Sequence, residues 1–210
     1  FYLKLPFFIN NIDLKLVKGF EIYEHQLNML KSALNGNHSV ITTGTGSGKT
    51  ESFLMPLFGQ IFKEMFNPKY PWGKPDSRSS NQFHWRNEDN NFVSHRKNEN
   101  RPSGIRALVI YPMNALVEDQ MTRMRKTLCS LESDNFFNDY CSSNRIYIGR
   151  YNGSTPVSGP ERNISGNLNK DKYKKLKEQI ISYEQIYNKL SKEEEWKYSF
   201  PIPVSHYDDL

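Results

Sequence analysis

The sequence predicts an α/β domain in which helices cover a parallel sheet. Three short apolar runs have the character of strands, helical patterns lie between them, and a glycine-rich segment joins the first run to the helix after it. Strands that alternate with helices form βαβ units, whose strands run parallel and are covered by helices. A chain of 210 residues has room for one such domain with appended segments.

The strand-like runs are rich in β-branched and aromatic side chains and are bounded by polar residues. They cover residues 40–43, 105–111 and 145–151. Such runs are long enough to be the buried strands of a parallel sheet, which carry apolar side chains on both faces.

Four stretches place apolar side chains at helical spacing. They are residues 23–34, 48–66, 113–131 and 170–198, the last of which could form two helices. Asn35 and Gly36 follow the first stretch and predict its end, because helices commonly stop at such residues.

Changes in composition divide the chain into five segments. In order, they are an N-terminal lead-in (1–18), the first two helices with the glycine-rich segment (19–66), a polar surface insertion that we expect to be partly disordered (67–104), the second and third strands with the helix between them (105–155), and a polar loop with a charged helical region (156–210). Trp72 and Trp85 are isolated aromatics in the insertion. They could stack on bases, but loop aromatics more commonly cap local clusters, which is what we expect of them.

The composition limits the environment and the partners. Two cysteines without a metal-ligand pattern favour a reducing, cytoplasmic compartment, and no run is apolar enough to suggest a membrane span. A net charge of +5 permits a nucleic-acid partner without requiring one. Because the sequence starts with Phe1, we expect it to have been cut from a longer protein.

The segment with the clearest chemistry is a phosphate-binding loop. It consists of Thr43, Gly44, Thr45, Gly46, Ser47, Gly48, Lys49 and Thr50. Glycines let the backbone turn so that successive N–H groups face a polyphosphate, and the start of the next helix adds positive potential. Lys49 is predicted to contact the β- and γ-phosphates of ATP, and the Thr50 hydroxyl is predicted to bind Mg²⁺. Thr43 stands where the common form of this loop has its first glycine.

That replacement resembles motif I of superfamily 2 DEAD/DEAH-box helicases, and two other segments match the same family. Residues 19–26 resemble its Q motif, which implies that Phe20 and Gln26 read adenine; a solvated Gln26 is the alternative. Residues 111–120 resemble motif Ia, which implies contacts with a nucleic-acid backbone. Those contacts would come from Pro112, Met113, Asn114 and Gln120, with charge added by Arg123. The alternative is an ordinary amphipathic helix that packs on the sheet and whose polar residues make no such contact.

The resemblance implies a three-layer RecA-like domain with polar insertions, truncated in this chain, from an ATP-dependent helicase or translocase that hydrolyses ATP. The form of motif Ia is closer to DNA-directed bacterial repair or defence helicases than to RNA helicases, which favours DNA over RNA.

The family's acidic motif II, Asp-Glu-x-Asp/His, does not occur in the 210 residues, nor does the second RecA-like domain. Hydrolysis depends on activating water and neutralising charge, so we expect this chain to bind ATP but to need the remainder of its own chain for hydrolysis. Two alternatives are a P-loop ATPase of another class and a hydrolysis-deficient remnant that binds nucleotide or nucleic acid.

Overall fold

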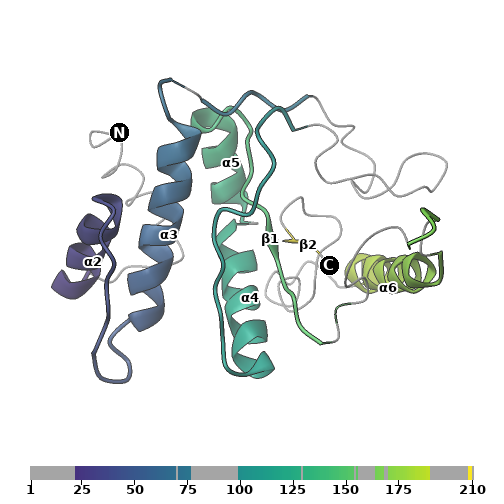
Figure 1. Ribbon diagram of the computed structural model, residues 1–210, viewed down its shortest axis with the longest axis horizontal. Coiled ribbons are helices and arrows are strands. Elements are labelled where there is room, and N and C mark those ends of the chain that lie inside the picture. The colour runs from purple at the N-terminus through teal and green to yellow at the C-terminus, as the bar shows by residue number, and fades with distance from the viewer. Residues whose placement is uncertain are drawn as a thin grey trace. The chain divides into compact units, whose positions relative to one another are not determined.

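The computed structural model of the chain describes residues 22–69, 71–76, 99–128, 130–153, 155, 164–167, 170–189 and 208–209. These residues fall into two units. The first contains residues 22–76, 99–110 and 131–144, apart from those not described, and the second contains the rest. Figure 1 labels the helices and strands of both units.

The first unit is built around helix α3, Lys49–Met65, which carries the longest row of buried side chains. Helix α2, Glu24–Leu34, lies alongside it (Figure 1). The two helices approach closely at Gly59, where an added Cβ would lie 3.3 Å from the side chains of both Leu30 and Leu34. A glycine at this position therefore allows the apolar face of α2 to seat on α3.

Aromatic side chains cover α3 from helix α5, Leu131–Tyr140. The Phe62 ring stacks on Phe137 with ring centroids 6.3 Å apart, and Phe136 meets it edge-on at 5.8 Å. Aromatic pairs favour these two arrangements, and all three rings are buried. The sequence analysis did not predict α5 and expected one helix to continue to residue 131.

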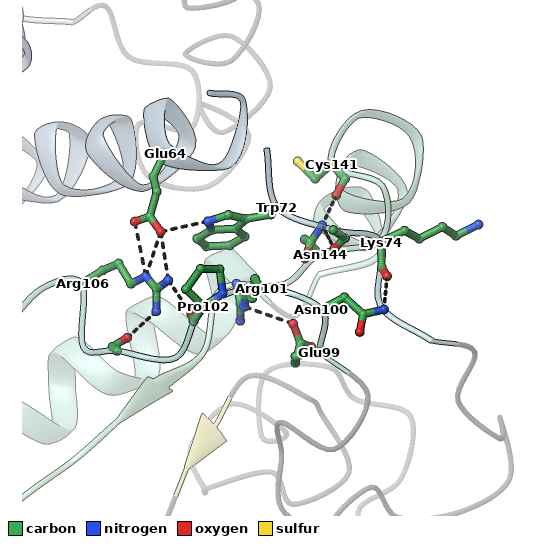
Figure 2. A network of polar contacts seen from close by, with 12 residues as sticks. Glu64, Trp72, Lys74, Glu99, Asn100, Arg101, Pro102, Arg106, Cys141 and Asn144 are labelled. Atoms are coloured by element: carbon green, nitrogen blue, oxygen red, sulfur yellow. Dashed lines mark hydrogen bonds and ion pairs between the residues drawn. The ribbon is translucent and has the colours of Figure 1, made fainter. Parts of the chain in front are cut away.

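A polar network at the C-terminal end of α3 ties distant segments of the first unit together (Figure 2). Glu64 accepts hydrogen bonds from the Trp72 indole at 2.9 Å and from the Arg106 guanidinium at 2.9–3.3 Å. Arg101 lies over the Trp72 ring, 4.2 Å from its centroid, and forms an ion pair with Glu99. Trp72 is buried, which agrees with the expectation that it caps a local cluster.

Gly73 and Asn100 belong to two described stretches, residues 71–76 and 99–110, that contact each other. Asn100 Nδ2 donates to Lys74 O at 2.8 Å and to Asp76 Oδ1 at 3.1 Å. An added Cβ at Gly73 would lie 2.7 Å from Asn100 O, so the backbones approach as closely as only glycine permits. Residues 77–98 themselves lie outside the described part, as does Trp85.

The second unit contains helices α4, Asn114–Leu128, and α6, Lys170–Lys189. Its two short strands, β1 Ile148–Gly149 and β2 Asp208–Asp209, pair in parallel. Glu118 of α4 forms an ion pair with Arg150, which follows β1. Helix α6 is one helix through Lys189; residues 190–198, which the sequence analysis also expected to be helical, lie outside the described part.

The predicted strands are the main difference from the sequence analysis. Residues 40–43 and 105–111 form no strand, and within 145–151 only Ile148–Gly149 does. A strand is defined by ladder hydrogen bonds to a neighbour, and neither of the first two runs makes them. Their apolar side chains are correspondingly exposed, with Val40 at 91% and Ile105 at 89%. The larger parallel sheet therefore remains a prediction.

Among the described helices, none combines the length and the apolar composition needed to cross a membrane.

Candidate nucleotide-binding site

The glycine-rich segment forms a tight turn that leads directly into α3. Gly46 and Gly48 have positive φ angles of 77° and 72°. Side chains other than glycine rarely adopt this left-handed region, which explains why glycine occupies both positions. Helix α3 begins at Lys49 with Gly48 as its N-cap, as the sequence predicted.

Hydroxyl groups form hydrogen bonds within the loop. Ser47 Oγ donates to Gly44 O at 2.8 Å and lies 2.7 Å from the Thr43 hydroxyl. The threonine that replaces the usual first glycine therefore has a structural partner, four residues further along the same loop.

Lys49 places its ammonium group against the loop. Its Nζ donates to Thr43 O at 2.8 Å and to Gly44 O at 2.6 Å, and the side chain remains exposed. The N–H groups in the first turn of a helix lack intrahelical acceptors, so the start of α3 adds partial positive charge beside this ammonium group. An added Cβ at Gly44 or Gly46 would meet no atom within 4 Å, so the loop is open there.

This donor set fits the phosphates of a nucleotide. The loop offers an accessible ammonium group beside the N–H groups of the first turn of α3, and Thr50 adds a hydroxyl one position into α3. In such an arrangement, Lys49 would contact phosphate oxygens and Thr50 would hold Mg²⁺, which would neutralise phosphate charge.

Two neighbouring side chains of α2 contact the end of the loop. His25 Nε2 lies 3.0 Å from Ser47 O, and Gln26 Nε2 donates to Gly48 O at 3.0 Å. Gln26 Oε1 also accepts a hydrogen bond from Tyr23 N at 2.9 Å. Gln26 is only 2% exposed, so it is not the solvated side chain that was the alternative in the sequence analysis.

Gly48 lies too close to α2 for a side chain to fit. An added Cβ would lie 2.3 Å from Gln26 Nε2, closer than real Cβ contacts allow. Gly48 O also accepts from the Ser52 backbone N–H at 3.1 Å and from its hydroxyl at 3.0 Å. Ser52 and Gln26 are both buried, so the junction between loop and helix is held from two sides.

The predicted nucleotide-site residues from Thr43 to Thr50 thus lie in one loop and helix start, with Gln26 beside them. Phe20 lies outside the described residues. The sequence analysis assigned no role to His25 or Ser52, although both stand close to predicted site residues. Only their contacts with the loop carbonyls, His25 with Ser47 O and Ser52 with Gly48 O, single them out.

The predicted nucleic-acid residues lie in the second unit, around the start of α4. Pro112, Met113 and Asn114 are exposed there. Gln120 is buried instead, and its Nε2 donates to Asp119 at 3.1 Å. The half-buried Arg123 lies further along the same helix.

Charged groups of α4 also act on Tyr111, which precedes these residues. Burial raises the pKa of Tyr111 above its usual value of 10.0, the positive charge of Arg123 opposes the rise, and Asp119 adds to it. Arg123 and Asp119 therefore lie close enough to the Tyr111 hydroxyl for their charges to matter.

Comparison with known proteins identifies the family. A family model described as DEAD/DEAH box helicase matches residues 23–142. The Druantia protein DruE of Escherichia coli (strain UMEA 4076-1) is 36% identical over 140 residues, which cover 65% of this chain and 6% of that protein. The chain therefore corresponds to a small part of that relative's length. No solved structure matches the chain.

The matched region contains α2, the phosphate-binding loop, α3, α4 and α5, so it includes the residues of the candidate site. Since the model covers more than half of the sequence, the chain belongs to the DEAD/DEAH box helicase family.

Proposed function

We propose that this chain binds ATP with Mg²⁺ and supplies the nucleotide-binding part of an ATP-dependent helicase or translocase. The observation that carries the proposal is the Lys49 ammonium group, held at the turn of the glycine-rich loop by Thr43 O and Gly44 O. Phosphate oxygens would take the place of these carbonyls, because an ammonium group binds an anion more strongly than a neutral acceptor.

The proposed roles follow from the chemistry of each group. Lys49 contacts the β- and γ-phosphates, Thr50 holds Mg²⁺, and the loop from Thr43 to Gly48 surrounds the phosphates with backbone N–H groups. Gln26 and Phe20 are proposed to read adenine, as in the family's Q motif. The contact from Gln26 to Gly48 O gives Gln26 a second role, in holding the loop.

A nucleic-acid strand is the proposed substrate, with DNA favoured over RNA. The exposed Pro112, Met113 and Asn114 at the start of α4 are proposed to lie against the sugar–phosphate backbone, with Arg123 adding charge. The buried Gln120 is better suited to holding this helix in place than to direct contact. Such contacts position a strand without reading its sequence.

Hydrolysis is proposed for the protein only with further parts. The acidic motif II and a second RecA-like domain would come from the remainder of its own chain, in the cytoplasm. Family membership argues against a P-loop ATPase of another class. The remaining alternative, a remnant that binds nucleotide without hydrolysing it, makes the same prediction for binding by this chain.

A titration with a fluorescent ATP analogue tests the proposal. We expect Lys49→Ala to abolish measurable binding, since the ammonium group held at the loop turn is removed. Lys175→Ala is the matched control, because it removes an exposed lysine from α6 and should leave affinity unchanged. Equal affinity of wild type and Lys49→Ala would remove the central claim.

A further inference from the structure

Two consecutive side chains of α2 contact two consecutive carbonyl groups of the phosphate-binding loop. His25 Nε2 lies 3.0 Å from Ser47 O, and Gln26 Nε2 lies 3.0 Å from Gly48 O. Residues 25 and 26 are 22 positions away from their partners in the sequence, so these are tertiary contacts and not part of either helix.

The His25 contact defines the chemistry of its ring. A carbonyl oxygen can only accept, so Nε2 must carry the hydrogen. Both the neutral Nε2–H tautomer and the imidazolium ion supply that donor. The ring also stacks on Tyr23, with centroids 5.5 Å apart and an angle of 14° between the planes, which restricts its rotation.

These contacts determine which way the loop's N–H groups point. In a planar trans peptide, the C=O and the N–H of the same unit point in opposite directions, and the described residues contain no cis peptide. The carbonyl of Ser47 shares its peptide with the N–H of Gly48, and the carbonyl of Gly48 shares its peptide with the N–H of Lys49. When α2 holds both carbonyls, the N–H groups of Gly48 and Lys49 point away from α2.

We propose that His25 is a positioning residue for polyphosphate, which acts by holding Ser47 O so that the Gly48 N–H faces the bound phosphates. The proposal rests on the nucleotide-binding function proposed above. It assigns to His25 an effect on the phosphate part of the ligand and none on the base. Gln26 cannot replace it, because its amide holds the next peptide along.

Two substitutions of His25 distinguish the effect of its hydrogen-bond donor from the effect of its ring. His25→Phe keeps a flat ring beside Tyr23 but removes the donor, whereas His25→Gln offers an amide N–H in place of Nε2–H. Because one hydrogen bond is lost, we expect His25→Phe to lower the affinities for ATP and for inorganic tripolyphosphate by the same factor, about threefold to tenfold. His25→Gln should restore both affinities to within about twofold of wild type, since its amide replaces that single bond.

Competition of each ligand against a fluorescent ATP analogue, in the 210-residue chain, gives these affinities. Circular dichroism at the titration temperature establishes that each variant is folded, and His25→Leu replaces His25→Phe if the latter is not. Wild-type affinity in the variant without the donor would overturn the inference, as would a glutamine variant as weak as the phenylalanine one. A loss confined to ATP, with tripolyphosphate unaffected, would overturn it too. If wild type binds neither ligand, the proposed function itself fails.

Discussion

Replacing Gly48 with alanine tests the junction between α2 and the phosphate-binding loop. The substitution has two separate consequences. It forces a residue with a Cβ into a backbone conformation with φ of 72°, and it places that Cβ 2.3 Å from Gln26 Nε2. The Gln26 amide must then move away from Gly48 O, to which it now donates.

The size of the effect can be worked out from these two consequences. A left-handed conformation costs a residue other than glycine about 1–2 kcal/mol. Displacing a buried amide from its acceptor adds roughly 1–3 kcal/mol, because Gln26 is 2% exposed and has little access to water. We therefore expect Gly48→Ala to lower the free energy of unfolding by about 3 kcal/mol, the sum of the two parts.

Gly36→Ala is the matched control. Gly36 has a similar φ of 82°, but an added Cβ there would meet nothing within 4 Å. Gly36→Ala should therefore lower the free energy of unfolding only by the cost of the backbone conformation, about 1–2 kcal/mol. Urea unfolding followed by circular dichroism measures both variants, with the m-value confirming that the transitions are comparable.

A double variant isolates the contact with Gln26. Gln26→Ala removes the amide that obstructs the new Cβ, so Gly48→Ala should cost less in its presence than alone. If Gly48→Ala and Gly36→Ala destabilise the chain equally and the double variant is additive, the Gln26–Gly48 contact does not hold the loop.

Three further predictions concern other contacts. Gln26→Ala should weaken the binding of both ATP and GTP, because the contact with Gly48 is lost with either ligand. It should weaken ATP binding more than GTP binding, because the contact with adenine is lost as well. Equal losses of affinity in a competition titration would reject the adenine role. Arg123→Ala should lower the affinity for single-stranded DNA by the same factor for any sequence and reduce the salt slope of binding by about one. A loss of affinity that differs between two unrelated sequences would contradict a backbone contact. The Arg106 guanidinium beside Glu64 holds the pKa of that carboxyl below its ordinary value of 4.5, although burial opposes the shift. Stability from this pair is thus present above pH 4.5 and is lost as the pH falls through the lowered pKa. Glu64→Gln should cost about 1 kcal/mol at pH 7, a small value because the Glu64 side chain is 41% exposed. In urea unfolding, that cost should shrink below pH 4; a cost independent of pH would reject the ion pair as its source.

The loop and the helices next to it could be predicted because their signals are local. Glycines at 46 and 48 adopt the positive φ angles for which glycine is suited, and α2 ends at Leu34, just before Asn35 and Gly36, as expected. Helix α3 spans Lys49–Met65 within the predicted range of 48–66. A helix forms its hydrogen bonds within its own segment, so its sequence carries most of the information.

The strands that the sequence predicts at 40–43 and 105–111 do not form in the structure, because strands depend on less local information. An apolar, β-branched run shows that a segment suits a sheet, but its hydrogen bonds belong to a neighbour. Helix α5 was missed for a related reason, since its apolar positions are few and Phe136 and Phe137 become significant only against Phe62 of α3.

The sequence by itself determined the phosphate-binding loop, its helix and the family, because the glycines and the lysine that define the loop lie within eight consecutive residues. Only the tertiary structure decided the contacts of Gln26 and His25 with the loop, and those of Trp72, Arg101 and Arg106 around Glu64. In each case the partner lies far along the chain or in another element. A hydrogen bond depends on a distance and an angle in space, and the order of residues along the chain does not specify either.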